Sequence, residues 1–417
     1  MDLAPPRDIR ITCAPLLAPF LSEQVARLDL PVVDQTRTSV SVRGTWTDTW
    51  RLCLELRTAF QVLYPLHTFT CRSPEDLYRA SRAMAWETII DPDGYLTVES
   101  RVDHPSINNS MFPNLRLKDS IVDRLSAVIG RRPDSGPERR GVVVHLFWKD
   151  DKATISLNAA GRKLADRGYR RNPHKAPLQE TLAAAVVLAS GWRGREPLAL
   201  PMCGSGTLAI EAALIALDRA PGLLRSGFGF THVRGFDEKT WSVLRAETRR
   251  RAGRHPGAPI IASDLDERAI EAAWQNAETA GVARLIEFHV SDFATAPLPE
   301  KPGVLIVNPE YGARLGEEAA LRPTYKRLGD YFKKSCAGWT CFVLSGNKEL
   351  TGSLGLKSNR RVPLFNAEIE CRLLRYEMWA GSRDAGGRSS ERSPGRDDEH
   401  NEPLRRQSRN GKMISDQ

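Results

Sequence analysis

LPMCGSGT, at residues 200–207, separates two segments with different hydrophobic patterns. Residues 196–199 read as a short buried strand, and residues 208–216 have the spacing and composition of a helix. The stretch is therefore a Gly-rich turn from a strand into a helix. Gly204 and Gly206 would let the backbone approach a ligand that a Cβ would exclude, and the helix N-terminus supplies N–H groups for a carboxylate or a ribose. One such turn alone is equally compatible with a packing role.

Two further predicted strands end in an acidic residue. Residues 259–263 form an apolar run that ends at Asp264, and residues 285–290 lead into Ser291-Asp292-Phe293. Asp264 can grip ribose hydroxyls, and Asp292 offers an acceptor for an adenine amino group beside the aromatic edge of Phe293. Each acid alone is also compatible with an ordinary helix N-cap. The ordered series of strand ends, all on the carboxyl edge of one sheet, favours a nucleoside site.

A fourth predicted strand, residues 303–307, delivers Asn308-Pro309-Glu310-Tyr311 to the same edge. An exocyclic amine on guanine or adenine is a poor nucleophile because its lone pair is delocalised into the ring, so acceptors must hold its hydrogens. The side-chain oxygen of Asn308 and the carbonyl of Pro309 can do this, and Tyr311 offers a face on which an extruded base can stack. An Asn-Pro turn with a packed tyrosine is the alternative. Beside a nucleoside site, the loop predicts methyl transfer onto an exocyclic base nitrogen.

Three further motifs flank the Gly-rich turn. They are RGYR at residues 167–170, APLQETLAAA at residues 176–185, and RGFD at residues 234–237 with Trp241 after it. With these motifs, the chain resembles the THUMP-domain-containing class I methyltransferases that make N2-methylguanosine in RNA, especially the bacterial enzymes of large-subunit ribosomal RNA. The resemblance covers roughly residues 5 to 380. It implies an α/β fold, with a Rossmann-like class I methyltransferase domain preceded by α+β ferredoxin-like and THUMP modules.

The resemblance also assigns residues to a site. The resemblance implies that the cofactor is S-adenosylmethionine. It also implies that the cofactor is bound by residues of the turn and at the two strand-end acids: Pro201, Cys203, Gly204, Gly206, Thr207, Asp264, Asp292 and Phe293. Direct in-line transfer to guanine N2, without a metal or a covalent intermediate, is assigned to Asn308, Pro309 and Tyr311. The implied partner is RNA, either ribosomal RNA or an assembling large ribosomal subunit.

Two positions depart from the family pattern. Leu200 stands where the family has Asp, which removes a carboxylate near the positively charged methionine end of the cofactor. Glu310 stands where the family has a second Pro, which loosens the loop but adds an acid that can accept a proton from the amine or contact the guanine edge. These departures are the support for one alternative, a non-catalytic RNA-binding or ribosome-assembly protein with a decayed site. Six matched residues weigh against it: Gly204, Gly206, Asp264, Asp292, Asn308 and Tyr311. The other alternative is an adenine-N6 or protein-glutamine methyltransferase, which shares the Asn-Pro-x-Tyr logic.

The expected domains are a ferredoxin-like module at 1–70, a THUMP module at 71–165, the methyltransferase domain at 166–381 and a disordered tail at 382–417. In the first module the pattern predicts strand, helix, strand, helix, strand, over residues 9–13, 16–28, 39–44, 47–59 and 60–65. In the second it predicts a helix at 74–86, a strand at 95–102, a helix at 117–129, and a hairpin with strands at 141–148 and 153–158.

The charge is consistent with an RNA partner. The net charge is +9, and residues 382–417 hold eight basic and seven acidic side chains, so the body retains +8. Residues 162–175 carry six Lys or Arg against one acid, which predicts a phosphate-contacting linker. With one residue added from the THUMP resemblance, the predicted RNA-binding residues are Arg167, Tyr169, Arg170, Arg171, Lys175 and Lys118. A second basic cluster at residues 245–254 is equally compatible with a solvated helix face.

The remaining composition favours a cytoplasmic protein. No apolar run approaches the roughly eighteen residues that span a bilayer, and the first residues lack the apolar core of a signal peptide. The seven cysteines have no Cys-x-x-Cys spacing, which argues against a disulfide framework and a zinc site. Cys203 is expected to fit the tight turn and not to act as a nucleophile. The sequence makes no prediction of the oligomeric state.

Overall fold

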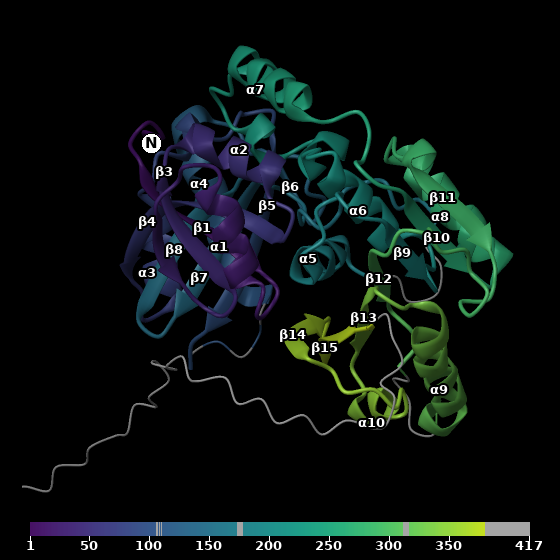
Figure 1. The fold of residues 1–417 in the computed structure, drawn as a ribbon. Coiled ribbons are helices and arrows are strands. Elements are labelled where there is room, and N and C mark those ends of the chain that lie inside the picture. The colour runs from purple at the N-terminus through teal and green to yellow at the C-terminus, as the bar shows by residue number, and fades with distance from the viewer. Residues whose placement is uncertain (106, 108, 110, 173–177, 312–316, 380–417) are drawn as a thin grey trace, which may run out of the picture. The chain divides into compact units, whose positions relative to one another are not determined.

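The computed structural model describes residues 1–379 except 106, 108, 110, 173–177 and 312–316. The tail expected at 382–417 lies outside the described residues. Within the described part, the strands form two sheets, and both are flanked by helices (Figure 1). The predicted α/β fold class is confirmed.

The first module has the predicted order of elements. They are β1 (Arg7–Cys13), α1 (Ala18–Ala26), β3 (Ser39–Gly44), α2 (Trp46–Glu55) and β4 (Ala59–Thr70). The sequence missed the edge strand β2 (Val32–Gln35), because all four of its residues are exposed and give no alternating pattern. Helix α2 ends before Ala59, the predicted end, because that residue is already a buried position of β4.

The second module also follows the predicted order. Its elements are α3 (Pro74–Arg82), the 3₁₀ helix η1 (Trp86–Thr88), β5 (Tyr95–Asp103), α4 (Met111–Ile129), β6 (Asp134–Ser135), β7 (Val142–Lys149) and β8 (Lys152–Asn158). The predicted hairpin is confirmed as β7 and β8. Helix α4 begins six residues earlier than predicted, and the end of the predicted helix at 74–86 is the separate turn η1.

The two modules share one continuous sheet. Among the described residues its strand order is β2-β3-β1-β4-β8-β7-β5-β6. The antiparallel pairing of β4 with β8, from Leu63 opposite Asn158 to Thr70 opposite Lys152, joins the modules. A surface on this sheet can therefore take residues from both modules.

The second sheet belongs to the methyltransferase region. Its strands are β9 (Leu198–Pro201), β10 (Ile260–Asp264), β11 (Ile286–Val290), β12 (Val304–Val307), β13 (Thr340–Ser345), β14 (Arg360–Asn366) and β15 (Ile369–Glu377). In the described part the order is β11-β10-β9-β12-β13-β15-β14, with the first five parallel and the last two an antiparallel hairpin. The chain order reverses between β9 and β12, and ligands of such sheets bind outside the carboxyl ends at that point.

Helices and 3₁₀ turns connect these strands. They are α5 (Glu180–Ser190), α6 (Thr207–Ala216), η2 (Pro221–Leu224), η3 (Gly229–His232), α7 (Glu238–Arg251), α8 (Glu267–Thr279), η4 (Ala283–Leu285), α9 (Glu317–Ser335) and α10 (Lys348–Gly352). Helices α5 and α6 consist almost entirely of buried residues, as expected for helices between a sheet and another layer.

One hydrophobic core runs from the first sheet into the methyltransferase region. Trp50 of α2 stacks on Phe230 of η3, with ring centroids 5.3 Å apart. The RGFD motif lies at the same junction, because Arg234 Nη1 donates a hydrogen bond to the carbonyl of Glu87 at 2.8 Å. The motif therefore holds the methyltransferase region to the THUMP module.

Candidate active site

The carboxyl ends of four parallel strands meet at one edge of the second sheet. Strands β11, β10, β9 and β12 lie side by side in that order. The register places Pro201 opposite Ser263 and Asp264 opposite Val290. The Gly-rich turn, the two acids and the loop at 308–311 therefore follow neighbouring strand ends, as predicted.

The Gly-rich turn is fastened to the end of β10. The N–H of Gly204 donates to Asp264 Oδ2 at 2.9 Å, and the N–H of Cys203 donates to the carbonyl of Ser263 at 3.0 Å. The N–H of Gly206 closes the turn on the carbonyl of Cys203, also at 3.0 Å. Asp264 thus sets the shape of the turn, in addition to its predicted role toward ribose.

The two glycines of the turn serve different purposes. Both have positive φ, +55° at Gly204 and +80° at Gly206. A Cβ on Gly206 would lie 2.9 Å from the Cβ of Ala273, so this glycine allows close packing on α8. A Cβ on Gly204 would meet nothing within 4 Å, so open space lies beside this residue. Gly206 is also the N-cap of α6 and supplies no side-chain cap, which leaves the helix N-terminus for a ligand.

The other residues of the turn are largely buried. Leu200 is 1 % exposed and belongs to the hydrophobic core, and Pro201 and Thr207 are buried. Burial, with the Asp264 carboxylate nearby, raises the pKa of the Cys203 thiol. This thiol stays protonated at neutral pH, which argues against a nucleophilic role.

Asp292 follows β11 and holds two hydrogen-bond donors. Its Oδ1 accepts from the N–H of Ala294 and from Arg327 Nη2, both at 2.9 Å. The Arg327 guanidinium also lies 4.9 Å from the ring centroid of Phe293, which is 6 % exposed. The sequence missed Arg327, since it comes from α9, 35 residues after Asp292, and no local motif links the two.

Two buried polar atoms at this edge have no hydrogen-bond partner among the described residues. They are the Oδ1 of Asn308, directly after β12, and the Oγ of Ser291, directly after β11. Burying an acceptor without a donor is costly, so such atoms commonly meet a ligand or water. Asn308 Oδ1 is the predicted acceptor of the amine hydrogens, and no described residue donates to it.

The Tyr311 ring contacts the β14–β15 hairpin. Its hydroxyl accepts from Asn366 Nδ2 at 2.6 Å, and a Cβ on Gly346 would lie 3.3 Å from the ring. Burial raises the pKa of Tyr311 to about 12, so the side chain is neutral at physiological pH. Pro309 beside it is buried and Glu310 is exposed.

A second tyrosine, Tyr325 of α9, fastens the same loop. It is fully buried, and its hydroxyl lies 3.2 Å from the carbonyl oxygen of Glu310, to which it donates, and 3.1 Å from Ser345 Oγ. The loop that lacks a second proline is therefore held by a hydrogen bond from outside it. The sequence missed Tyr325, since a single tyrosine in an amphipathic helix carries no signal.

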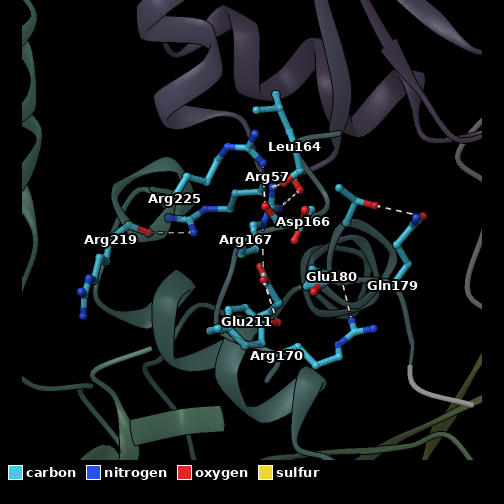
Figure 2. Close-up of polar contacts among 12 residues, drawn as sticks. Arg57, Leu164, Asp166, Arg167, Arg170, Gln179, Glu180, Glu211, Arg219 and Arg225 are labelled. Atoms are coloured by element: carbon cyan, nitrogen blue, oxygen red, sulfur yellow. Dashed lines mark hydrogen bonds and ion pairs between the residues drawn. The ribbon is translucent and has the colours of Figure 1, made fainter. Parts of the chain in front are cut away.

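The predicted RNA-binding residues of the linker are not all at the surface, and two of these predictions are wrong. Arg167 is 1 % exposed, and its guanidinium donates to the carbonyls of Leu164 and Arg57 and lies 3.6 Å from Glu211 Oε1 (Figure 2). Tyr169 is also 1 % exposed and donates to Glu211 Oε1 at 3.1 Å. Both side chains are oriented inward by the buried Glu211 carboxylate and cannot reach a phosphate.

The other predicted RNA contacts differ among themselves. Arg170 has a side chain that is 18 % exposed, and it forms an ion pair with Glu180 at 2.9 Å (Figure 2). Its positive charge is therefore paired within the protein. Arg171 is exposed, and Lys118 is partly exposed but lies 3.0 Å from Asp119. Lys175 lies outside the described residues. Sequence alone counts these charges correctly but cannot show which of them face inward.

A broad groove of about 630 Å³ begins beside the loop at 308–311. Its lining includes Gly346, which adjoins the Tyr311 ring. The charged lining residues are Lys348, Lys357, Arg361, Arg372 and Glu370. This basic groove offers cations next to the candidate site.

Among the residues that the structure describes, no helix is long and apolar enough to cross a membrane. In the same residues, no cluster of three or more His, Cys, Asp or Glu side chains is arranged to hold a metal ion.

Three family models match the chain in sequence order. The RlmL ferredoxin-like domain matches residues 8–63, the THUMP domain residues 71–158, and the RMKL-like methyltransferase domain residues 167–375. Similar curated proteins include the ribosomal RNA large subunit methyltransferases K/L of Syntrophotalea carbinolica and Pseudomonas aeruginosa. The first is 38 % identical over 86 % of this chain and 52 % of its own length, and the second 36 % identical over 98 % and 58 %. The chain thus spans about half the length of the curated relatives it matches.

Solved structures share the fold of nearly the whole chain. A putative methyltransferase complexed with SAH (S-adenosylhomocysteine) is 25 % identical, with a TM-score of 0.81 over 92 % of this chain and 100 % of its own. A structure from Listeria monocytogenes, described as a predicted N6-adenine-specific DNA methylase, is 28 % identical, with a TM-score of 0.79 over 89 % and 96 %.

Proposed function

The chain belongs to the family of RMKL-like methyltransferase domains, and we propose from this premise that it transfers a methyl group from S-adenosylmethionine to the N2 amine of a guanine in large-subunit ribosomal RNA. The curated relatives are named as methyltransferases of large-subunit ribosomal RNA, which supports this class of substrate. The similar structure solved with SAH supports the choice of cofactor.

The observation that carries this proposal is the buried Oδ1 of Asn308, which has no hydrogen-bond partner in the part of the chain that the structure describes. An amide oxygen at this place can accept a hydrogen bond from an exocyclic amine, and it would hold the lone pair of that amine toward the methyl donor. A buried acceptor gains more from such a bond than an exposed one, because no water competes for it. The amide works by orientation, without exchanging a proton.

The residues at the sheet edge fit the cofactor. The open space beside Gly204 and the N-terminus of α6 can receive its methionine part, Asp264 its ribose, and Asp292 its adenine amino group. Leu200 has no carboxylate to offer the cofactor, and its side chain is 1 % exposed within the core. When bound, S-adenosylmethionine supplies an electrophilic methyl group.

The chain's own residues then position the base. Tyr311 is fixed by Asn366 and can stack on a base beside Asn308. The loop keeps its shape because Tyr325 binds the carbonyl of Glu310. Glu310 is exposed and can take up the proton that the amine loses on methylation. The basic groove beside Gly346 would hold phosphates that flank the target nucleotide.

Adenine N6 is the second candidate acceptor. The Listeria structure bears the name of an adenine methylase, and the Asn-Pro-x-Tyr loop suits either amine. The THUMP match and the ribosomal RNA relatives favour guanine in RNA.

The test is a product digest. Large-subunit ribosomal RNA from cells that lack this gene is incubated with the protein and methyl-labelled S-adenosylmethionine, then digested to nucleosides. We expect the label in N2-methylguanosine. Label in N6-methyladenosine would support the second candidate. Absence of label, with SAH binding retained, would support the non-catalytic reading.

A further inference from the structure

The first sheet has a polar side as well as a side packed on helices. Along β1, Ile9 and Ile11 are fully buried in the core, whereas Arg10 and Thr12 between them are partly exposed. The register places Arg10 opposite Ser41 of β3, and Thr154 and Ser156 of β8 line a groove together with these two residues. One side of the sheet therefore presents polar residues from several strands.

A groove of about 590 Å³ lies on that side, and we call it the sheet groove. It is lined by Arg10 and Arg43 of the first module and by Phe147, Lys152 and Thr154 of the THUMP module. It therefore crosses the β4–β8 pairing that joins the modules. Its charged lining residues are Arg7, Arg10, Arg43, Lys152 and Asp8, four cations against one acid.

Arg10 and Phe147 form the floor of the groove. The guanidinium carbon of Arg10 lies 4.7 Å from the centroid of the Phe147 ring, although strands β4 and β8 separate β1 from β7. The hydroxyl residues Thr154 and Ser156 of β8 line the groove between them and leave room for the arginine to cross. This distance is that of a cation–π contact, so the ring helps to hold the guanidinium in place.

The cations of the groove are not equally available. Arg43 pairs with Asp8 at 2.9 Å, and Arg7 donates to the carbonyls of Pro65 and Leu66. Arg10 forms no ion pair within the described part of the chain. Burial and the neighbouring Arg101 lower its pKa, and Asp34 opposes this only in part. Arg101 of β5 lies opposite Phe147 of β7 in the register, next to the lining of the groove, and two like charges near one another would gain from an anion placed between them.

His145 adds a neutral polar group to the groove. It is 8 % exposed, and its Nδ1 has no hydrogen-bond partner among the described residues. Burial, together with Arg10 and Arg101, lowers its pKa to about 4, so the ring is uncharged at neutral pH. An unsatisfied buried nitrogen that lines a groove indicates that a ligand or water completes it.

We propose that the sheet groove binds an unpaired strand of RNA, with a base stacked on the Arg10 guanidinium and phosphates on Arg101 and Lys152. This inference rests on the proposed function for the choice of RNA. Guanidinium planes and aromatic rings stack on unpaired bases, whereas the bases of a duplex are already stacked on each other. A groove that offers a stacking surface and is lined by several cations therefore fits a single strand of RNA better than an RNA duplex.

The experiment measures binding without methylation. The full chain is titrated into a labelled single-stranded RNA of about twelve nucleotides, and separately into the corresponding RNA duplex, at several salt concentrations. Arg10→Gln should weaken single-strand binding about tenfold and lower the slope of log K against log salt by about 0.7. Phe147→Leu keeps the apolar volume but removes the ring beneath Arg10, and should weaken single-strand binding about two- to fivefold, as for loss of a cation–π contact.

Arg27→Gln is the matched control. It removes the same charge from an exposed position at the end of α1, outside the groove, and should change the affinity less than about twofold. Unchanged SAH affinity and unfolding temperature will show that each variant is folded. Equal losses in Arg27→Gln and Arg10→Gln, equal affinity for duplex and single strand, or normal binding by both groove variants would each overturn the proposal.

Failure of the proposed function is separable from failure of this inference. If no methyl transfer is found but Arg10→Gln and Phe147→Leu lose single-strand binding, the proposal that the sheet groove binds RNA is supported and only the proposed reaction is wrong. If transfer occurs and both variants bind RNA normally, the reaction stands and the groove is wrong.

Discussion

The side-chain amide of Asn276 donates a hydrogen bond to the carbonyl oxygen of Ser205 at 3.1 Å. Its Oδ1 accepts from the backbone N–H groups of Arg171 and Asn172, at 3.0 and 3.1 Å, and its Nδ2 also donates to the carbonyl of Asn172. Asn276 is fully buried on α8. One side chain thus ties the linker after the THUMP module to the Gly-rich turn.

Asn276→Ala should weaken SAH binding about tenfold, measured by calorimetry. The substitution leaves two linker N–H groups and the Ser205 carbonyl without their buried partner, and each such group costs about 1–3 kcal/mol. Gln275→Ala is the control, since Gln275 bonds the exposed side chain of Asn172 and does not contact the turn. An unchanged SAH affinity in Asn276→Ala, with a normal unfolding temperature, would show that the turn does not depend on the linker.

Tyr325→Phe should lower the rate of methyl transfer about tenfold while SAH affinity stays within about twofold. The change removes the hydroxyl that binds the Glu310 carbonyl and Ser345, at about 1 kcal/mol for each neutral hydrogen bond. Single-turnover rates at saturating cofactor measure the effect. Tyr331→Phe on the same helix is the control, because the Tyr331 hydroxyl has no partner among the described residues. A larger effect from the control would contradict this role of Tyr325.

Glu180→Gln should alter how stability depends on pH. Burial raises the pKa of Glu180 to about 7 from its ordinary 4.5, and Arg170 opposes this only in part. The folded chain therefore holds this proton more tightly than the unfolded chain. Its contribution to stability is complete below pH 4.5 and is lost as the pH rises to about 7. Urea unfolding at pH 4.5 and pH 8 should show the variant gaining about 3 kcal/mol relative to wild type between these values.

His145 titrates in the same window with the opposite sign. Its lowered pKa removes stability as the pH falls from 6.5 toward 4, and it does so equally in wild type and in the Glu180 variant. The difference between the two proteins therefore isolates Glu180. A difference that stays constant from pH 4.5 to 8 would mean that this carboxyl group is not perturbed.

The basic groove beside Gly346 should contribute to RNA affinity and not to cofactor affinity. The double variant Lys357→Gln and Arg361→Gln should raise the KM for RNA and lower the slope of log K against log salt by about 1.4 for a single strand. SAH binding should be unchanged. A lower SAH affinity, or an unaltered salt slope, would show that these cations do not contact phosphates.

Much of the architecture could be predicted from the sequence because each strand end carries its own local signal. The turn around Gly204, the acid Asp264 and the Asn308 loop each follow a short apolar run, and parallel strands bring them to one edge. The edge strand β2 escaped prediction, because exposed residues in a short strand have no hydrophobic period.

The partners of the site residues could not be predicted in this way. Arg327, Tyr325 and Asn276 reach the site from helices far along the chain, and only the packing of those helices brings them near. Charge counting failed for the opposite reason. Arg167 is basic and lies in a basic linker, yet the buried carboxylate of Glu211 draws it inward.

Methyl transfer by Asn308→Ala is the most direct test of the central claim, that Asn308 Oδ1, which has no partner among the described residues, orients the amine of the target base. We predict that the transfer rate falls at least about a hundredfold, as for loss of one oriented polar contact to reacting atoms, while affinity for SAH and for RNA stays within about threefold. Transfer at near the wild-type rate, or equal loss of transfer and of both binding affinities, would contradict it.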